Sequence, residues 1–397
     1  MKTSRAIPAV LVGLLVAALA PVTATANTER ISDPNDVKGL LDIHYSRAGH
    51  AGTSVTQTLV TYGSWSSTIL KKDGFFAIGF DTNNHIAEPE RWVIISYRSK
   101  LVADVYNGDL TVYEGPAKVS RPNARSVRTT ITRARLGNPT GYHWASFGFY
   151  QTKAVCPKQC VDRAPNRGFV LHDITPPAEV LKAFPIVSTD TSATTTFPVK
   201  FSVTDPGYSG VASWSLQRRV DGTTTWHAIA SGTTHGVHTV QVSGSPGTTY
   251  QFRVVAVDKQ HNRSASPRAK VTVPVDDTDP GITKSAAGGT NTSGTDWIAA
   301  GDSMDYQTTL VHSAVVGAYV SYTYPTSRIA LVYPDTTYSG SATLCIDAIT
   351  PCTTVSETIG TAYRQRTSFI NAGPGPHTVT VTVQSGDFAV DGFAYRN

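Results

Sequence analysis

Apolar and polar residues alternate along most of this chain, and residues 249–258 give the clearest example. Apolar side chains fall at every second position of that segment, at Tyr250, Phe252, Val254 and Ala256. Successive side chains of a strand point to opposite faces, so this pattern predicts a half-buried β-strand packed on a second sheet. Gln251 and Arg253 lie between the apolar positions and are expected to face water. A tyrosine at the start of such a strand can bond its hydroxyl to the adjoining corner of the chain.

The same period of two recurs on both sides of this strand, and no long helical period occurs after residue 26. Strands are predicted in the first part of the chain at 59–62, 74–80, 91–97, 101–106, 126–133 and 144–149. They are predicted in the last part at 316–324, 327–333, 340–346, 363–369, 375–383 and 388–393. Many strands without intervening helices indicate an all-β protein.

Two turn-rich segments divide the chain. They are Asp-Ile-Thr-Pro-Pro at 173–177 and Asp-Asp-Thr-Asp-Pro-Gly at 276–281. Proline cannot donate to a sheet ladder, and acidic turn residues interrupt pairing, so both segments are typical of linkers. A chain of 397 residues is also too long for one sandwich. We therefore predict a leader at 1–26 and three tandem β-sandwich domains at 27–175, 176–278 and 279–397.

Several features of the middle domain occur together. They are the strand that begins at Tyr250, a strand at 210–219 with Trp214, the turn Asp221-Gly222, Trp226 and the segment 262–267. In combination they resemble a fibronectin type III domain of secreted bacterial proteins. The resemblance implies an immunoglobulin-like sandwich that acts as a spacer. On this reading, Trp214 and Trp226 pack in the core and against strands.

The flanking domains carry weaker resemblances. Residues 33–36 and 75–83 look similar to the N-terminal β-sandwich of actinobacterial secreted proteins, and more distantly to DOMON and family-nine carbohydrate-binding sandwiches. Gly-Pro-His-Thr-Val-Thr-Val-Thr-Val at 375–383 and Val-Asp-Gly-Phe at 390–393 resemble a galactose-binding-like jelly roll of the carbohydrate-binding-module type. These resemblances imply a DOMON-like sandwich first and a jelly roll last.

The first residues are typical of a Sec-type secretory signal peptide. An apolar run at 7–20 follows Lys2 and Arg5, and small residues at 24–26 offer a cleavage site. The run is shorter than the roughly 20 apolar residues of a membrane-spanning helix. The sequence therefore predicts a secreted, extracellular protein that is cleaved near Ala26 and does not insert into a membrane.

The charge of the chain argues against nucleic acid as a partner. The formal net charge is only +5. One cluster of arginines occurs, at Arg121, Arg125, Arg128, Arg133 and Arg135. No recognisable DNA- or RNA-reading motif accompanies it. An arginine-rich outer strand face that keeps a sheet edge from mispairing explains the cluster more simply.

Four cysteines occur in two local pairs, Cys156 with Cys160 and Cys345 with Cys352. An even number of cysteines in an exported chain favours disulfides. Three pairings are open, and the long separation between the two pairs favours a short-range bond within each. A zinc site is the alternative, but the spacing Cys-Pro-Lys-Gln-Cys differs from the usual two-residue knuckle, and no histidine pair lies beside it.

Common signatures of hydrolases are absent from the sequence. It has no G-x-S-x-G elbow, H-E-x-x-H helix, S-x-x-K motif or P-loop. Ser209 lies in a predicted turn, without the strand-to-helix context of a nucleophile. The acid pairs that a glycosidase would need are available, for example Glu88 with Glu90, but acids in a polar hairpin are usually solvated. We predict that the chain itself catalyses no reaction and needs no cofactor. A structural calcium ion is a separate hypothesis.

The calcium hypothesis concerns the loop after the strand at 74–80. Asp81, Asn83 and Glu88 (or Glu90) supply the hard oxygen ligands that calcium prefers. The spacing is short of a full calcium loop. The alternative is a hairpin in which Asp81 and Asn83 bond their own backbone.

The carbohydrate-binding hypothesis concerns the third domain, which is rich in tyrosine. Aromatic rings stack on sugar rings, and a few polar side chains orient them. Tyr333 and Tyr338 flank a loop that contains Asp335, and Arg364 is expected to add hydrogen bonds. Core or edge packing of these tyrosines is the alternative.

These features together predict a secreted, non-catalytic protein that binds a glycan or another cell-envelope polymer. One alternative is a polysaccharide hydrolase (a glycosidase) or its accessory subunit. Another is a structural adhesin with protein partners. Recognition in such folds lies in loops and surfaces rather than in the scaffold, so the ligand does not follow from the fold.

Overall fold

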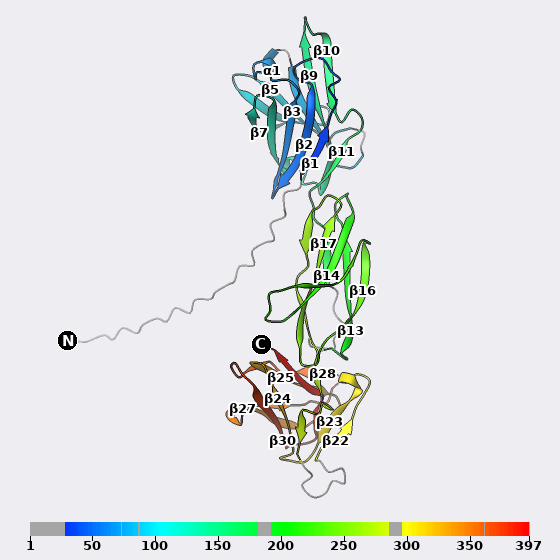
Figure 1. The fold of residues 1–397 in the computed structure, drawn as a ribbon, viewed down its shortest axis with the longest axis vertical. Coiled ribbons are helices and arrows are strands. Elements are labelled where there is room, and N and C mark those ends of the chain that lie inside the picture. The colour runs from blue at the N-terminus through cyan, green and yellow to red at the C-terminus, as the bar shows by residue number, and fades with distance from the viewer. Residues whose placement is uncertain are drawn as a thin grey trace, which may run out of the picture.

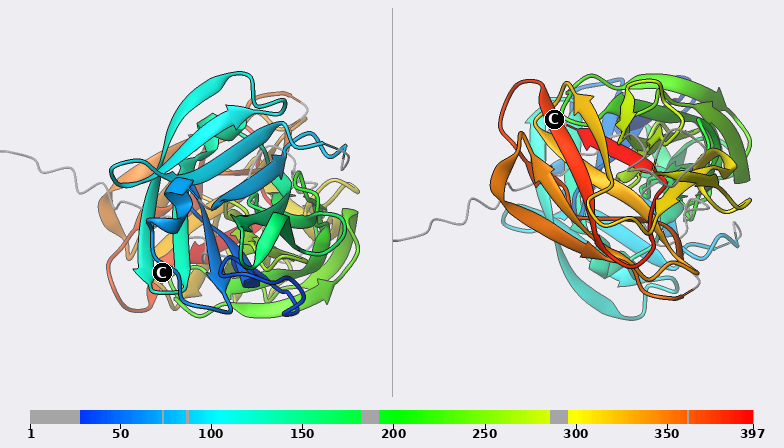
Figure 2. Two further views of the ribbon diagram at one scale, coloured as in Figure 1. Left: turned by 90° about the horizontal axis from the view of Figure 1, so that it is seen from above. Right: turned by 90° about the horizontal axis from the view of Figure 1, so that it is seen from below.

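The computed structural model describes residues 28–72, 74–85, 88–181, 192–285, 296–360 and 362–396. The predicted signal peptide therefore lies outside the described residues. The described chain forms three β-sandwich modules that follow one another along the long axis of the molecule (Figure 1). The end-on views in Figure 2 show the modules lying over one another. The all-β prediction is confirmed: among the described residues, the one α-helix, α1 (Ile69–Lys72), has 4 residues.

The first module spans residues 28–174 and contains one sheet that folds over on itself. The strand order is β1-β2-β3-β8-β7-β6-β5-β4-β9-β10, and β11 pairs with β9. Strand β7 turns the corner, because it pairs with β8 at one end and with β6 at the other. The strands are β1 (Thr28–Ser32), β2 (Ile43–Ala51), β3 (Ser54–Thr61), β4 (Gly74–Asp81), β5 (Arg91–Tyr97), β6 (Leu101–Asn107), β7 (Tyr113–Asn123), β8 (Ser126–Thr132), β9 (Gly141–Thr152), β10 (Cys156–Ala164) and β11 (Val170–Asp173). A short 3-10 helix, η1 (Arg133–Leu136), follows β8.

The middle module spans residues 178–273 and is a sandwich of two sheets. One sheet has the order β12-β13-β16, and the other has the order β15-β14-β17-β18, with β19 paired to β17. This is an immunoglobulin-like arrangement. The strands are β12 (Ala178–Leu181), β13 (Thr196–Thr204), β14 (Val211–Val220), β15 (His227–Gly232), β16 (Gly236–Ser243), β17 (Thr249–Asp258), β18 (Arg263–Ala265) and β19 (Ala269–Thr272).

In β17 the predicted orientation of the side chains is confirmed for the apolar face but not for Gln251 on the other face. Tyr250, Phe252, Val254 and Ala256 are at most 6% exposed and join the core of the middle module. Gln251 was expected to face water, but it is only 7% exposed. It is covered because Arg219 donates to its side-chain oxygen and its amide donates to Asp221. Trp214 lies in the core as predicted. Trp226 is half-buried and packs on the neighbouring strands, with the guanidinium of Arg253 of β17 4.3 Å from its ring centre.

The hydroxyl of Tyr250 accepts a hydrogen bond from the backbone N–H of Ser245 at 3.0 Å, as expected for a tyrosine that ties down a corner. Replacing Tyr250 with phenylalanine leaves this N–H without a partner, so we expect a loss of about 1 kcal/mol in the free energy of unfolding. Urea unfolding followed by tryptophan fluorescence measures the change. An unchanged midpoint would mean that the bond contributes nothing to the stability of the module.

The third module spans residues 275–396 and is built from three small sheets. Their orders are β20-β32-β25-β28, β21-β24-β30-β26-β27 and β22-β23-β31, and β29 pairs with β25. Val275 and Asp276 already pair with the last strand, so bonding to this module begins before Pro280. The elements are β20 (Val275–Asp276), β21 (Ile282–Lys284), β22 (Ile298–Ala300), η2 (Tyr306–Thr308), β23 (Leu310–Ser313), β24 (Tyr319–Tyr324), β25 (Arg328–Asp335), β26 (Ser341–Ile346), β27 (Ile349–Ser356), β28 (Ala362–Arg366), β29 (Ile370–Asn371), β30 (His377–Ser385), β31 (Phe388–Val390) and β32 (Gly392–Arg396).

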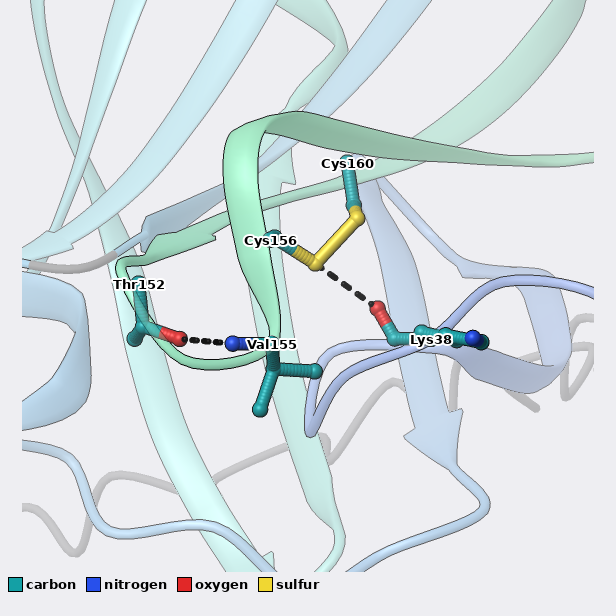
Figure 3. Close-up of a disulfide and its surroundings, with 5 residues drawn as sticks. All are labelled: Lys38, Thr152, Val155, Cys156 and Cys160. Atoms are coloured by element: carbon teal, nitrogen blue, oxygen red, sulfur yellow. Dashed lines mark hydrogen bonds between the residues drawn. A yellow bond between two sulfur atoms is a disulfide. The ribbon is translucent and has the colours of Figure 1, made fainter.

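Both predicted disulfide pairings are present. Cys156 is joined to Cys160, with Cα atoms 5.7 Å apart, and Cys345 is joined to Cys352, with Cα atoms 4.5 Å apart. The first bond lies within β10, near its start, where the pairing with β9 is irregular (Figure 3). The second closes the hairpin between β26 and β27.

Candidate functional site

The strongest candidate site is the outer face of the first module, on strands β6, β5, β4, β9 and β10. The inward side chains of β4 are Phe76, Ile78 and Phe80, which are 0% exposed and belong to the core. Because side chains alternate, Phe75 lies on the opposite, outer face and is only half-buried. The outer faces of β5 and β9 are also apolar, at Trp92, Ile94, Phe147 and Phe149. An outer sheet face that carries several partly exposed apolar side chains side by side is a candidate binding surface.

The aromatic side chains of this face form a continuous row, which we call the aromatic row: Trp92, Phe147, Phe149 and Phe75. The ring centres of Trp92 and Phe147 are 5.4 Å apart, and those of Phe147 and Phe149 are 6.2 Å apart. Phe149 and Phe75 are stacked at 4.3 Å. Such pairs hold each other in fixed orientations. The row therefore presents a preformed apolar platform, with little conformational freedom left to lose on binding.

A groove adjoins the Phe75 end of the aromatic row. Its apolar lining comes from Leu70 of α1 and from side chains of β4, β5 and β6 and the turn after β6, namely Phe75, Ile94, Tyr106 and Leu110. Its polar lining comes from Ser96, Gln151, Gln159, Lys71 and Lys72. Gln151 and Gln159 are exposed, so their amides are free to meet a ligand. An apolar floor with a few polar groups at the edge is the usual composition of a ligand site.

Arg163 of strand β10 lies beside Phe147 of the aromatic row. Its guanidinium carbon lies 5.5 Å from the ring centre of Phe147 and 5.3 Å from that of Phe169. The same side chain donates to the carbonyl oxygens of Pro165 and Gly168. Arg163 is thus held flat against the aromatic row by cation–π contacts and backbone bonds. Among the described residues that line the groove, the charged ones are Lys71 and Lys72, and both are cationic.

The predicted glycan-binding tyrosines of the third module are both half-buried against other aromatic rings. Tyr333 is half-buried and faces Phe388, with ring centres 6.4 Å apart. Tyr338 is half-buried against His312, at 5.1 Å. Asp335 accepts a hydrogen bond from the backbone N–H of Thr358. Glycan binding at these residues stays a prediction.

Arg364 differs from its neighbours because it is buried, with only 3% of its surface exposed. Its guanidinium donates to the carbonyl oxygen of Met304. Burial lowers the pKa of Arg364, and the carboxylates of Asp391 and Asp305 oppose that shift. The side chain thus fixes the loop before η2. We therefore leave Arg364 out of the surface set and retain Tyr333, Asp335 and Tyr338.

The predicted calcium ligands lie in the turn after β4. The carboxylate of Asp81 accepts the backbone N–H groups of Asn83 and Asn84, at 3.2 Å and 3.0 Å. Asn83 accepts from the N–H of His85. Glu88 is exposed, and it is Glu90 that bonds to the backbone of Thr82. These contacts match the hairpin in which the side chains bond their own backbone. Calcium at this loop stays a prediction.

Sequence reasoning missed the aromatic row. The sequence signal was present, because β4, β5 and β9 carry large apolar residues at consecutive positions, which point to opposite faces, as in Phe75-Phe76 and Trp92-Val93. A strand that is apolar on both faces is expected in the middle of a protein, covered on both sides. Here one of the two faces meets solvent, and only the fold reveals which.

Known proteins give likenesses of fold alone. No protein-family model and no curated protein matches the chain. A carbohydrate-binding module of the β-sandwich superfamily is 16% identical, with a TM-score of 0.28, over 56% of this chain and 98% of that one. The FN1–FN3 domains of chicken CNTN1 are 12% identical, with a TM-score of 0.24, over 91% and 96%. A family two carbohydrate esterase from Cellvibrio japonicus is 13% identical, with a TM-score of 0.21, over 30% of this chain and 31% of the esterase.

Among the described residues, no helix is long and apolar enough to cross a membrane. The two disulfides fit an extracellular protein, since such bonds persist in oxidising compartments.

Proposed function

We propose that this protein is a secreted, non-catalytic binding protein whose first module holds a polysaccharide or another cell-envelope glycan on the aromatic row. The observation that carries the proposal is the row itself: four half-buried rings in mutual contact on an outer sheet face, beside a groove edged by amides. The middle module acts as a spacer, and Tyr333 and Tyr338 provide a second glycan surface in the third module.

The chemistry of a sugar ring suits this surface. The C–H groups on one face of a pyranose are apolar and rest on an aromatic ring, while the hydroxyl groups at its edge need hydrogen-bond partners. Phe75 and Phe149 supply the ring contact, and Gln151, Gln159 and Ser96 supply donors and acceptors. The cationic side chains of Lys71, Lys72 and Arg163 favour a neutral or anionic glycan over a cationic one such as chitosan.

The proposal is tested by retention on insoluble polysaccharides and cell walls. Residues 27–397 are incubated with the panel, and release of reducing ends is assayed in the same tubes. We expect retention without release, and weaker retention on chitosan than on uncharged polymers. Release of reducing ends would favour the alternative of a glycosidase. Failure to bind any member of the panel would favour an adhesin with protein partners.

Phe149→Ala is the variant that tests the row. Burial of a phenylalanine side chain contributes about 1.5–3 kcal/mol, so its loss is expected to weaken binding about 10- to 100-fold. The matched control is Tyr319→Ala, which removes a ring that is 40% exposed on β24, away from the row. Circular dichroism confirms that both variants fold. Equal binding by Phe149→Ala and the parent protein would remove the row from the account.

A further inference from the structure

Four carboxylates converge at the edge of the first module, on the inner side of β10. Asp33, Asp36 and Asp42 come from the segment that joins β1 to β2, and Asp162 comes from β10. Each has a carboxylate oxygen within 4.8 Å of one from each of the others. Asp33, Asp42 and Asp162 are buried, at 4%, 4% and 2% exposure, and Asp36 is exposed. We call these residues the acidic cluster.

Two oxygens of the cluster are buried without a partner. In the described part of the chain, neither Oδ2 of Asp33 nor Oδ1 of Asp42 makes a hydrogen bond. No lysine, arginine or histidine among the described residues forms an ion pair with any member of the cluster. A buried carboxylate that lacks both a donor and a counter-charge is costly to maintain.

The electrostatics of the cluster reflect this cost. Burial, together with the carboxylates of Asp162, Asp36 and Asp42, raises the pKa of Asp33 to about 7. Burial raises the pKa of Asp42 to about 6, and Asp162 and Asp36 add to that rise. The four carboxyl groups thus repel one another where the fold places them, and a bound cation would offset that repulsion.

The backbone around the cluster is firmly held. Asp162 accepts from the N–H groups of Ile43 and Arg163. The hydroxyl of Tyr62 donates to the carbonyl oxygen of Asp33, and the N–H of Tyr62 donates to that of Asp42. The backbone that carries the carboxyl groups is thus fixed by the fold around the cluster.

The first disulfide braces the same segment from the side. The Sγ atom of Cys156 lies 3.1 Å from the carbonyl oxygen of Lys38, midway along the segment that carries the three acids (Figure 3). Asn166, which follows β10, donates to the carboxylate of Asp36 at 2.8 Å. The segment between β1 and β2 therefore contacts β10 and the residues after it in three ways: through the disulfide, through the hydrogen bond from Asn166 to Asp36, and through the acidic cluster.

We propose that the acidic cluster is a binding site for a divalent cation of the calcium class, which fastens the segment between β1 and β2 to strand β10. The oxygens of Asp33, Asp36, Asp42 and Asp162 are the hard ligands that calcium prefers, and calcium accepts the irregular geometry that they form. A hollow lined by Asp36, Asp42 and Tyr62 leads to the cluster from solvent and gives the ion a path of entry.

A second group of acids provides the internal control. Asp173, Asp205 and Asp258 also lie within 4.8 Å of one another, between the first and middle modules. Each of their carboxylate oxygens, however, accepts a hydrogen bond from a nearby N–H or hydroxyl group. Their negative charge is satisfied by these donors. We therefore expect Asp205→Asn to leave calcium binding unchanged.

The test uses residues 27–397 after removal of bound metal with EGTA. Calcium chloride, and separately magnesium chloride, is titrated in a calorimeter, and thermal unfolding is recorded with calcium and with EGTA. We expect one calcium ion per chain bound at the cluster, weaker binding of magnesium, and a rise of roughly 5–10 °C in the unfolding temperature at 100 times the Kd.

Asp42→Asn and Asp33→Asn distinguish a loss of calcium binding from a loss of folding. Each removes one buried negative charge while keeping the shape of the side chain, so both variants are expected to be at least as stable as the parent in EGTA. Both should lose the calcium-dependent rise. The proposal is overturned if the parent shows neither binding heat nor a rise with calcium. It is also overturned if both asparagine variants keep the rise or if Asp205→Asn abolishes it.

Discussion

Replacement of Tyr306 with alanine is expected to lower the free energy of unfolding of the middle module by about 3–5 kcal/mol, the usual cost of removing a large buried ring. Tyr306 belongs to the third module, in η2, but it is 0% exposed and packs in the hydrophobic core of the middle module. Backbone hydrogen bonds at Tyr306 and Gln307 also hold η2 at the junction between the middle and third modules. The N–H of Tyr306 donates to Asp391, and the N–H of Gln307 donates to the carbonyl oxygen of Ala193.

The consequence is that the two modules should unfold together. In the parent protein, urea unfolding followed by tryptophan fluorescence is expected to show one joint transition for the middle and third modules, and Tyr306→Ala should separate it into two. Tyr306→Phe is the matched control: it keeps the buried ring and removes only the hydroxyl, so it should cost far less than the alanine variant. A cost below about 1 kcal/mol for the alanine variant would contradict burial of this ring between the modules.

Replacement of Glu357 with glutamine is expected to stabilise the third module at neutral and alkaline pH. Glu357 is 4% exposed, and burial raises its pKa to about 9, while the carboxylates of Asp335 and Asp387 add to the rise. Its carboxyl oxygens face the backbone N–H of Ala389, whose hydrogen bond opposes the rise. The folded protein therefore holds a proton at Glu357 that the unfolded chain releases above its ordinary pKa of 4.5.

The sign of the pH dependence follows directly. Between pH 4.5 and about 9 the folded state binds more protons at this residue than the unfolded state, so its contribution to stability falls as the pH rises. Up to pH 7 the loss amounts to roughly 3 kcal/mol, at about 1.36 kcal/mol for each unit. Glutamine cannot ionise and should remove this slope. Urea unfolding from pH 5 to pH 9 measures it, with the exposed Glu88→Gln as control. If the free energy of unfolding depends on pH equally steeply in Glu357→Gln and in the parent, the raised pKa of Glu357 is contradicted.

The strands could be predicted because their signal is local. The strand predicted at 74–80 is β4 (Gly74–Asp81), and the one predicted at 91–97 is β5 (Arg91–Tyr97). Period-two alternation reports which side chains share a face, and that relation survives in the fold. It does not report what covers the other face. Gln251 was assigned to water for this reason, whereas Arg219 and Asp221 of the neighbouring strand and turn cover it.

The acidic cluster could not be predicted, because it is assembled over a long sequence separation. Asp42 and Asp162 are distant along the chain, and they meet only because β10 pairs with β9 at the edge of the sheet, beside the segment that enters β2. A search of the sequence for metal ligands favours residues that are close together, such as Asp81 and Asn83. In the structure, those side chains bond the backbone of their own turn.

The aromatic row required the fold for a different reason. The sequence contains its rings, but Trp92 on β5 and Phe147 on β9 become neighbours only across the intervening strand β4. The sequence instead favours Tyr333 and Tyr338 of the third module, because aromatic residues that flank a loop cannot all be buried. Comparing the glycan affinity of variants in the aromatic row with that of variants in the third-module tyrosines therefore distinguishes the two surfaces.

The most direct test of the glycan-binding proposal is a binding isotherm on the polysaccharide that retains the parent protein best. It compares the parent with Phe149→Ala and with the double variant Tyr333→Ala/Tyr338→Ala. The account predicts that Phe149→Ala weakens binding about 10- to 100-fold, while the tyrosine variant changes it by a smaller factor. Full affinity in Phe149→Ala, with loss of binding only in the tyrosine variant, would contradict the assignment of the aromatic row as the main binding surface.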